Sequence, residues 1–440
     1  MDFNTRYAKL NDNQRQAVDY IHGSLLVIAG PGTGKTELLS MRTAQILKQT
    51  DTLPNSILCL TFTESGATNM RQRLRQIIGE DAYKIAIHTF HSFGTEIINQ
   101  HREYFFRGAD AQPVDELTQY QIISGILEGL DWRNPLSAKN NGEFVYIKDL
   151  IRIISEFKQS GLTPSELRAI IEDNQNTIAE IAPDIQQVFS AKISKKTIEM
   201  FAPIAEKIAN LAAKNPDEKN SKLPASITPY ANVLALSIAH AAQEAIDENS
   251  TKPLTAWKNK WCEKNANGEF VLKDFTAAEK LSAAIDVYEK YVNILAERSL
   301  FDYDDMILSV IQACESHPEL RANLQEQFQF IMVDEFQDTN LAQLRLLFNL
   351  TSENDDNPNI MAVGDDDQAI FSFQGADVGN IQRFRQHYHD PKIIVLTDNY
   401  RSAENILSSA RDVITQGADR LENTIDGLSK QLTAHANSEG

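Results

Sequence analysis

Six short apolar runs, each followed by polar or glycine-rich residues, lie toward the two ends of the chain. They span residues 25–29, 57–61, 84–89, 328–334, 359–363 and 392–396. Runs of this length bounded by loop residues are typical of buried strands. Several are followed by segments with helical periodicity, such as TELLSMRTAQILKQ at 36–49 and ATNMRQRLRQIIG at 67–79. This alternation predicts a parallel sheet with helices on both faces.

The middle of the chain, from about residue 98 to residue 290, has a different pattern. Its apolar residues recur at helical spacing over long segments, for example IKDLIRIISEFKQSG at 147–161 and AAEKLSAAIDVYEKYVNILAE at 277–297. We therefore expect an α-helical insertion within the α/β domain. Two similar stretches, NNGEFVYIKDL at 140–150 and ANGEFVLKDF at 266–275, indicate local Asn-Gly turns rather than a repeat architecture.

A glycine-rich loop follows the first predicted strand. The stretch LLVIAGPGTGKTELL at 25–39 places AGPGTGKT between a strand and a helix, which is the context that a P-loop requires. Its glycines allow backbone N–H groups to curl around phosphate oxygens, and the helix N-terminus adds positive potential. Lys35 would reach the β and γ phosphates, and the Thr36 hydroxyl would bind Mg²⁺. The predicted nucleotide-binding loop comprises Ala29, where the pattern has glycine, and Gly30, Pro31, Gly32, Thr33, Gly34, Lys35 and Thr36.

A second apolar run, FQFIMVDEFQDTN at 328–340, ends on carboxylates. Burying a lone carboxylate is costly, so such a strand ends at a surface, a metal or a site. A P-loop protein needs a strand beside the first one whose end supplies a carboxylate for Mg²⁺ and often another to activate water. We assign Asp334 to the metal, through water, and Glu335 as the general base. For Asp338 we expect no more than a cap on the helix that follows.

Composition and charge narrow the classes of protein. At 440 residues, with 42% hydrophobic and 23% charged residues, the chain is typical of a soluble protein of two or three domains. It has no signal-peptide layout and no apolar stretch of about 18 residues, so we expect a cytoplasmic protein without a membrane partner. Cys59, Cys262 and Cys314 are predicted to be reduced and structural. The net charge of -19 argues against a broadly basic nucleic-acid surface but leaves room for a narrow basic or aromatic channel.

Taken together, eight motifs resemble the UvrD/Rep/PcrA-type superfamily 1 DNA helicases. In chain order they are LNDNQRQAV (10–18), AGPGTGKT, TFTESGATNMRQRL (61–74), HTFHSFG (88–94), FDYDDMI (301–307), VDEFQDTN (333–340), VGDDDQAIFSFQGAD (363–377) and LTDNYRS (396–402). The resemblance implies a RecA-like P-loop NTPase sheet with a large α-helical insertion domain and the start of a second RecA-like domain. The expected boundaries are 1–97 and 291–378 for the first motor domain, 98–290 for the insertion and 379–440 for the second motor domain.

The resemblance also implies roles around the nucleotide. Gln14 matches the glutamine that reads adenine, and Arg42 looks like the arginine that packs near the base. Gln368 would lie near the γ phosphate and couple its presence to the DNA site. Arg401 resembles the arginine that enters the ATP site from the second motor domain and stabilises charge on the transferred phosphate. The expected catalytic set is therefore Glu335, Lys35, Gln368 and Arg401, with ATP and Mg²⁺ as cofactors.

The same resemblance implies which residues contact DNA. The matching loops comprise Thr61, Phe62 and Thr63, and then Thr89, Phe90 and His91. Phe371 and Phe373 match the aromatic pair on which bases stack, an interaction that tolerates any sequence. For each aromatic residue the alternative is core packing, and His91 could equally be a partly buried structural histidine. Compared with commoner family forms, Glu64, Ser65, Gly66 and Gln374 replace residues that include a lysine and an arginine, which should weaken DNA binding.

These motifs lead to an expected function. We expect the ATP-binding region of an ATP-dependent 3′–5′ DNA helicase, a monomer that binds single-stranded or 3′-tailed duplex DNA and works with repair or replication proteins. The later motor-domain motifs do not occur in the sequence, so slow turnover and little unwinding are expected. Two alternatives stay open: a nucleotide-gated DNA- or protein-binding module without productive hydrolysis, and a nuclease-linked helicase subunit. A P-loop kinase is disfavoured, because DEFQDTN, DDDQ and NYRS would have no role in it.

Overall fold

The computed structural model describes residues 3–105, 111–189, 193–194, 198, 201, 203–204, 206–207, 230–264, 268–273, 278–351, 357–369, 379–389, 391–417, 420–425 and 427–435. The chain divides into two compact units. The first comprises Met1–Pro113, Lys158–Gly161 and Ser299–Gly440, and the second comprises Val114–Phe157 and Leu162–Arg298. None of the described helices is long and apolar enough to cross a membrane. The four domain ranges expected from the resemblance remain predictions.

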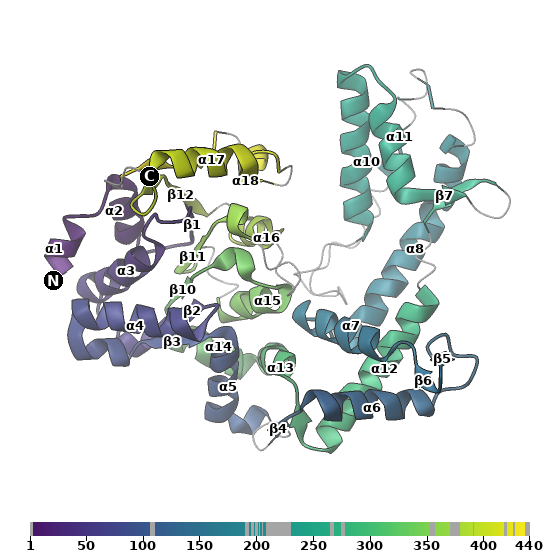
Figure 1. Ribbon diagram of the computed structural model, residues 1–440, viewed down its shortest axis with the longest axis horizontal. Coiled ribbons are helices and arrows are strands. Elements are labelled where there is room, and N and C mark those ends of the chain that lie inside the picture. Colours follow the sequence, from purple (N-terminus) through teal and green to yellow (C-terminus); the bar gives the residue numbers. More distant parts are fainter. Residues whose placement is uncertain are drawn as a thin grey trace. The chain divides into compact units, whose positions relative to one another are not determined.

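A six-stranded parallel sheet forms the centre of the first unit (Figure 1). All six predicted strands belong to it, which confirms the α/β fold class. The strand order is β12-β1-β11-β10-β2-β3. One predicted neighbour is wrong: β11 pairs with both β1 and β10 and so lies between them. The strands are β1 (Leu25–Ala29), β2 (Ile57–Thr61), β3 (Ala86–Thr89), β10 (Phe330–Val333), β11 (Ile360–Gly364) and β12 (Lys392–Leu396).

Helices cover both faces of this sheet. Alternate residues of β1 pack into two different clusters, because successive side chains of a strand point to opposite faces: Leu26 and Ile28 on one side, Leu25 and Val27 on the other. The second side is covered by α2 (Asp12–Asp19), α3 (Lys35–Gln49) and α4 (Glu64–Ile78). The first is covered by α5 (Phe90–Gln100), α13 (Tyr303–Ser316), α14 (Pro318–Gln327), α15 (Leu341–Leu350) and α16 (Gly379–His387).

The second unit is mainly helical, as the middle of the sequence predicts. Its helices are α6 (Glu116–Glu128), α7 (Ile147–Gln159), α8 (Pro164–Phe189), α10 (Tyr230–Asp247), α11 (Lys252–Trp261) and α12 (Ala278–Glu297). Each of the two similar sequence stretches contributes to an antiparallel hairpin. The first hairpin pairs β5 (Lys139–Asn140) with β6 (Glu143–Phe144), and the second pairs β7 (Cys262–Lys264) with β8 (Phe270–Leu272). Asn141 and Gly142 both have positive φ, 50° and 88°, as a two-residue hairpin turn requires. The interpretation as local turns is therefore confirmed for this hairpin.

A short segment at the C-terminal end of α7 and just beyond it, Lys158–Gly161, belongs to the first unit. The Lys158 ammonium is fully buried and lies 2.6 Å from both the Asp302 Oδ2 and the Asp305 Oδ1 atoms. Asp302 is also the N-cap of α13, where it accepts a hydrogen bond from the Asp305 N–H. The Gly161 carbonyl accepts a hydrogen bond of 2.6 Å from Arg345. Ion pairs and backbone contacts therefore fix this segment to α13 and α15.

Smaller elements complete the first unit. They are α1 (Phe3–Tyr7), β4 (Gln112–Pro113), β9 (Leu300–Phe301), β13 (Asp398–Asn399), α17 (Glu404–Ile414), α18 (Leu421–Thr424) and β14 (Thr433–Ala434). Strands β13 and β14 pair in parallel, so residues near the C-terminus lie beside the segment that follows β12. Cys59, Cys262 and Cys314 are free and buried, as predicted. Burial raises the pKa of each thiol to about 12.

Candidate functional site

The P-loop connects the carboxyl end of β1 to the N-terminus of α3. Gly32 and Gly34 have φ angles of 73° and 89°, which a side chain disfavours. The Thr33 hydroxyl donates a 2.8 Å hydrogen bond to the Gly30 carbonyl within the loop. The loop glycines were expected to adopt backbone angles that a Cβ disfavours. Gly30 does not have positive φ, so this reason does not apply to it. A Cβ at Gly30 would instead lie 3.0 Å from the Leu432 Cδ2 atom, so close packing favours glycine there.

The acidic end of β10 meets the P-loop lysine. The Lys35 ammonium lies 2.5 Å from the Glu335 Oε2 atom, although the residues are 300 positions apart in the sequence. Glu335 has a φ of 48°, a left-handed conformation that is uncommon for a residue with a side chain. Burial, and then the charge of Glu335, raises the pKa of Asp334 to about 6 despite the nearby Lys35. Thr36 follows Lys35 in the first turn of α3.

Gln337 connects this acidic end to β11. Its amide nitrogen donates a 3.0 Å hydrogen bond to the Glu335 Oε2 atom, and its Oε1 atom accepts one of 3.0 Å from the Asp365 N–H. A Cβ on Gly364 would lie only 2.6 Å from the Gln337 Oε1 atom. Gln337 is not among the site residues predicted from the sequence. The signal was present as a glutamine two residues after Glu335 and a glycine at the end of β11.

The expectation that Asp338 caps the next helix is wrong. Asn340 is the N-cap of α15, and its side chain forms a capping box with Gln343. Asp338 instead accepts a hydrogen bond from the Gln337 amide, and its other oxygen has no partner among the described residues. Burial and the Glu335 charge raise the pKa of Asp338 to about 6. A third carboxyl group therefore interacts electrostatically with the Lys35–Glu335 pair.

Replacing Gln337 with Leu should lower the free energy of unfolding by about 1–3 kcal/mol, because the buried Asp365 N–H and the half-buried Glu335 carboxylate each lose a hydrogen bond. Gln337 is 2% exposed, so water does not easily replace its amide. Urea denaturation of the chain measures the change. The matched control is Gln72→Leu on the exposed face of α4, which should change stability little. Equal stability losses in the two variants would contradict this role of Gln337.

Gln14 and Arg42 lie close to the P-loop. The Gln14 amide nitrogen donates a 2.9 Å hydrogen bond to the Thr33 carbonyl, and its oxygen accepts the Asn11 N–H. Gln14 is 5% exposed and is therefore not a surface glutamine. Arg42 is also buried, and its guanidinium donates to carbonyl groups at the C-terminal end of α2, including that of Ala17 at 2.8 Å. Burial lowers the pKa of Arg42 to about 10. Contacts of either residue with a nucleotide base remain predictions.

The other two predicted catalytic residues lie on loops beside the P-loop. The Gln368 amide nitrogen donates a 2.7 Å hydrogen bond to the Asp365 Oδ2 atom. The Tyr400 N–H donates to the Gly32 carbonyl at 2.9 Å, and a Cβ on Gly32 would lie 2.8 Å from the Arg401 Cβ atom. The NYRS segment therefore packs directly against the phosphate loop. Arg401 is exposed next to it.

The residues predicted to face DNA have mixed environments. Thr63 and Thr89 are the N-caps of α4 and α5, and the Thr89 hydroxyl donates to Glu64 at 2.9 Å. Thr61 is buried at the end of β2, whereas Phe62 is half-buried. Phe90 is 2% exposed and packs in the core, so its ring offers no face for base stacking in this structure. Phe371, Phe373 and Gln374 lie outside the described residues.

His91 and Tyr303 form an aromatic pair at the N-terminal ends of α5 and α13. Their ring centroids are 6.4 Å apart, with an interplanar angle of 83°. Burial lowers the pKa of His91, which favours its neutral form. Tyr303 is 66% exposed. Tyr303 lies in the motif FDYDDMI but is not among the residues predicted from the sequence, because nothing in the motif indicates which of its side chains is exposed.

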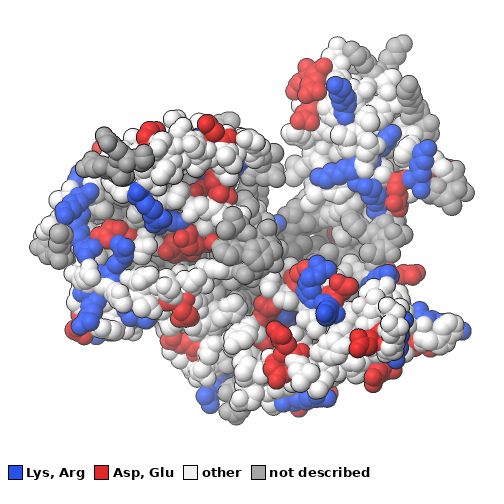
Figure 2. Space-filling model, in the orientation of Figure 1, with Lys and Arg blue, Asp and Glu red and all other residues white. Residues whose placement is uncertain are grey.

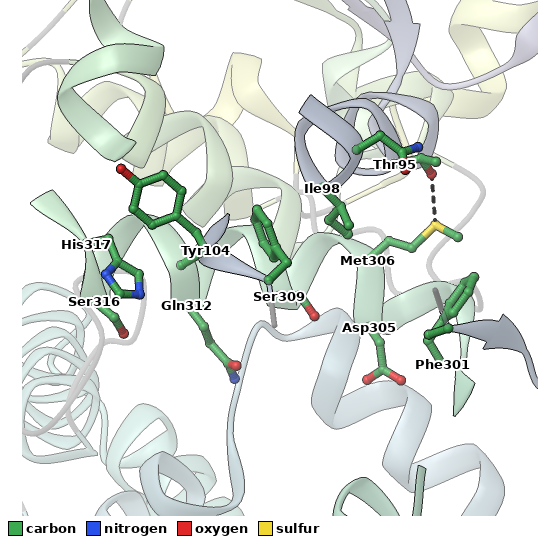
Figure 3. Close-up of a pocket in the computed structure, with 14 residues that line it drawn as sticks. Thr95, Ile98, Tyr104, Phe301, Asp305, Met306, Ser309, Gln312, Ser316 and His317 are labelled. Carbon is green, nitrogen blue, oxygen red and sulfur yellow. Dashed lines mark hydrogen bonds between the residues drawn. The ribbon is translucent and has the colours of Figure 1, made fainter. Parts of the chain in front are cut away.

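Two cavities lie in the first unit, among those that the described residues line. One, of about 540 Å³, lies along α5 and α13 and includes Ile98, Met306, Asp305 and Gln312 (Figure 3). It contains none of the predicted nucleotide-binding residues. The other, of about 430 Å³, is lined by Gly30, Pro31, Gln368 and residues of α17. This second cavity is the one that adjoins the P-loop.

The charge distribution on the visible face is mixed rather than uniformly basic. Figure 2 shows Lys and Arg side chains interspersed with Asp and Glu over both units. This pattern agrees with the net charge of -19. Any nucleic-acid contact on this face would therefore depend on local side chains rather than on a broad positive field.

A parallel sheet, a P-loop at the end of β1 and an acidic strand end touching the P-loop lysine define the class of RecA-like P-loop NTPases. Within this class, the model of the UvrD/REP helicase N-terminal domain matches residues 10–389, and the chain belongs to that family. The resemblance stated from the motifs is thus confirmed.

Individual relatives agree with this assignment. The chain is 27% identical over 419 residues to the ATP-dependent DNA helicase PcrA of Staphylococcus epidermidis, covering 95% of this chain and 41% of that protein. It is 28% identical over 411 residues to the ATP-dependent DNA helicase PcrA of Staphylococcus aureus, covering 93% and 40%. The chain therefore spans about two fifths of the length of these curated relatives.

Proposed function

We propose that this chain is the ATP-binding region of an ATP-dependent DNA helicase that moves 3′ to 5′ on single-stranded DNA. The observation that carries the proposal is the 2.5 Å contact between Lys35 and Glu335. This contact places a phosphate-binding lysine beside a carboxylate that can accept a proton from the attacking water. Family membership and the names of the relatives support DNA as the partner.

The donor atoms at the site suit Mg-ATP. Magnesium in nucleotide sites usually takes one or two carboxylates and keeps several waters, with substrate phosphates completing the shell. Thr36 and Asp334 would supply the protein oxygens, and no cluster of three or more acidic, His or Cys side chains is needed. Among the described residues no such cluster is placed to hold a metal. The magnesium ion, when bound, would neutralise charge on the β and γ phosphates.

The residue roles follow the predicted assignment. Lys35 would bind the γ phosphate, Glu335 would accept the water proton, and Arg401 and Gln368 would approach from the neighbouring loops. Gln14 and Arg42 would lie toward the base. The residues that we propose to contact DNA are Thr61, Phe62, Thr63, Thr89, His91, Phe371 and Phe373.

The test is ATP hydrolysis measured with Mg²⁺, with and without single-stranded oligo(dT). We expect hydrolysis to depend on Mg²⁺ and to increase when the oligonucleotide is present. Slow turnover by this chain alone is part of the prediction. If Mg-ATP does not bind in calorimetry, the NTPase proposal is wrong. If ATP binds but is never hydrolysed, the nucleotide-gated binding module becomes the better proposal.

A further inference from the structure

Lys430 lies among three consecutive carboxylates at the end of β11. Its ammonium is 3.1 Å from the Asp365 Oδ1 atom, 2.6 Å from the Asp366 Oδ1 atom and 2.6 Å from the Asp367 Oδ2 atom. Lys430 is only 8% exposed. Three adjacent carboxylates in one short turn repel each other unless cations compensate them. A residue near the C-terminus therefore supplies charge that the loop after β11 needs.

A second cation from the same region assists Lys430. The Arg420 guanidinium forms two hydrogen bonds of 2.8 Å with the two oxygens of Asp367. The Leu421 N–H donates a 2.8 Å hydrogen bond to the Asp366 Oδ2 atom. Asp366 and Asp367 therefore have partners besides Lys430. Asp365 also accepts a hydrogen bond from Gln368, one of the proposed catalytic residues. Its contact with Lys430 therefore bears on the proposed catalytic site.

Asp365 connects Lys430 to the proposed catalytic site. Its Oδ1 atom accepts from Lys430, and its Oδ2 atom accepts from the Gln368 amide at 2.7 Å. Its backbone N–H donates to Gln337, whose amide also binds Glu335. The cavity of about 430 Å³ that adjoins the P-loop is lined by Asp365, Gln368 and Lys430 together with Gly30. The Asp365 side chain that orients Gln368 is thus held by Lys430 and by the Asp367 N–H, which donates a 3.2 Å hydrogen bond to the Asp365 Oδ1 atom.

We propose that Lys430 is a positioning residue that holds Asp365, and through it the Gln368 amide, in the orientation that recognises the γ phosphate. The proposal rests on the proposed function, in which Gln368 lies near that phosphate. Lys430 does not touch the nucleotide in this scheme. Its loss should therefore weaken binding of a nucleoside triphosphate without weakening binding of the diphosphate.

The test compares Kd for Mg-ATPγS and Mg-ADP, measured by calorimetry on the full chain. Lys430→Met should raise the Kd for ATPγS about tenfold, the size expected when one hydrogen bond to a charged group is lost, and leave the Kd for ADP nearly unchanged. In a Gln368→Ala background, Lys430→Met should cause no further selective loss. The matched control is Lys84→Met, which removes an exposed lysine paired with Asp81 and should change neither Kd.

A second variant covers the case in which Lys430→Met does not fold. Asp365→Asn removes one of the crowded carboxylates and should show the same selective loss for ATPγS. If the wild-type chain binds neither nucleotide, the proposed function fails. If the wild-type chain favours ATPγS but the variants lose both nucleotides equally, or lose further affinity without Gln368, the positioning role of Lys430 is wrong and the proposed function stands.

Discussion

Replacing Glu335 with Gln should lower the rate of ATP hydrolysis by about 10²–10⁴-fold, the usual contribution of a general base. The substitution keeps the size of the side chain but removes its ability to accept a proton at neutral pH. Lys35 and Asp334 remain, so the variant should still bind Mg-ATP. Single-turnover hydrolysis of radiolabelled ATP measures the rate, and calorimetry measures binding.

The control for this substitution is Glu80→Gln, because the Glu80 side chain is 82% exposed and remote from the P-loop. It should hydrolyse ATP at the wild-type rate. If Glu335→Gln also hydrolyses at that rate, Glu335 is not the general base. If wild type and variant are both inactive yet bind ATP, the chain is better described as a nucleotide-gated binding module.

Replacing Lys158 with Met should lower the free energy of unfolding by about 3–5 kcal/mol, the loss typical when one partner is removed from a buried ion pair. Lys158 is fully buried, and its removal leaves Asp302 and Asp305 close together without a cation. Asp302 is the N-cap of α13, and Asp305 lies in its first turn. Urea denaturation followed by circular dichroism measures the change.

Two further variants test the cause of this loss. Lys84→Met removes an exposed lysine from a surface pair and should change stability little, because solvent screens such pairs. Combining Lys158→Met with Asp305→Asn should recover part of the lost stability, because one of the two adjacent carboxylates is gone. Equal destabilisation of the single and double variants would show that packing, rather than charge, explains the effect.

The fold could be predicted closely from the sequence because its strands are short, fully apolar and bounded by loop residues. Each of the six observed strands begins and ends within two residues of a predicted run. Asn141 and Gly142 were sufficient to indicate a hairpin turn, since few residues tolerate positive φ. Strand order was harder to predict. The position of β11 between β1 and β10 depends on how crossovers pack, which the pattern of apolar residues does not record.

The candidate site was predictable where a motif specifies local backbone geometry. Lys35 of the P-loop contacts Glu335 at the end of β10, as expected, because the carboxyl ends of parallel strands lie along one edge of the sheet. Side-chain partners were less predictable. Asn340, rather than Asp338, caps α15, and nothing in the sequence connects Lys430 with Asp365, which are 65 positions apart. Such contacts depend on how distant segments pack.

The three buried cysteines give the chain a practical property. All three thiols are buried and burial raises the pKa of each, whereas only an accessible thiolate reacts quickly with maleimides. A fluorophore could therefore be attached to a new cysteine at exposed Ser65, beside the proposed DNA loop, without first removing the native thiols. The folded protein is thus ready for site-specific spectroscopic labelling.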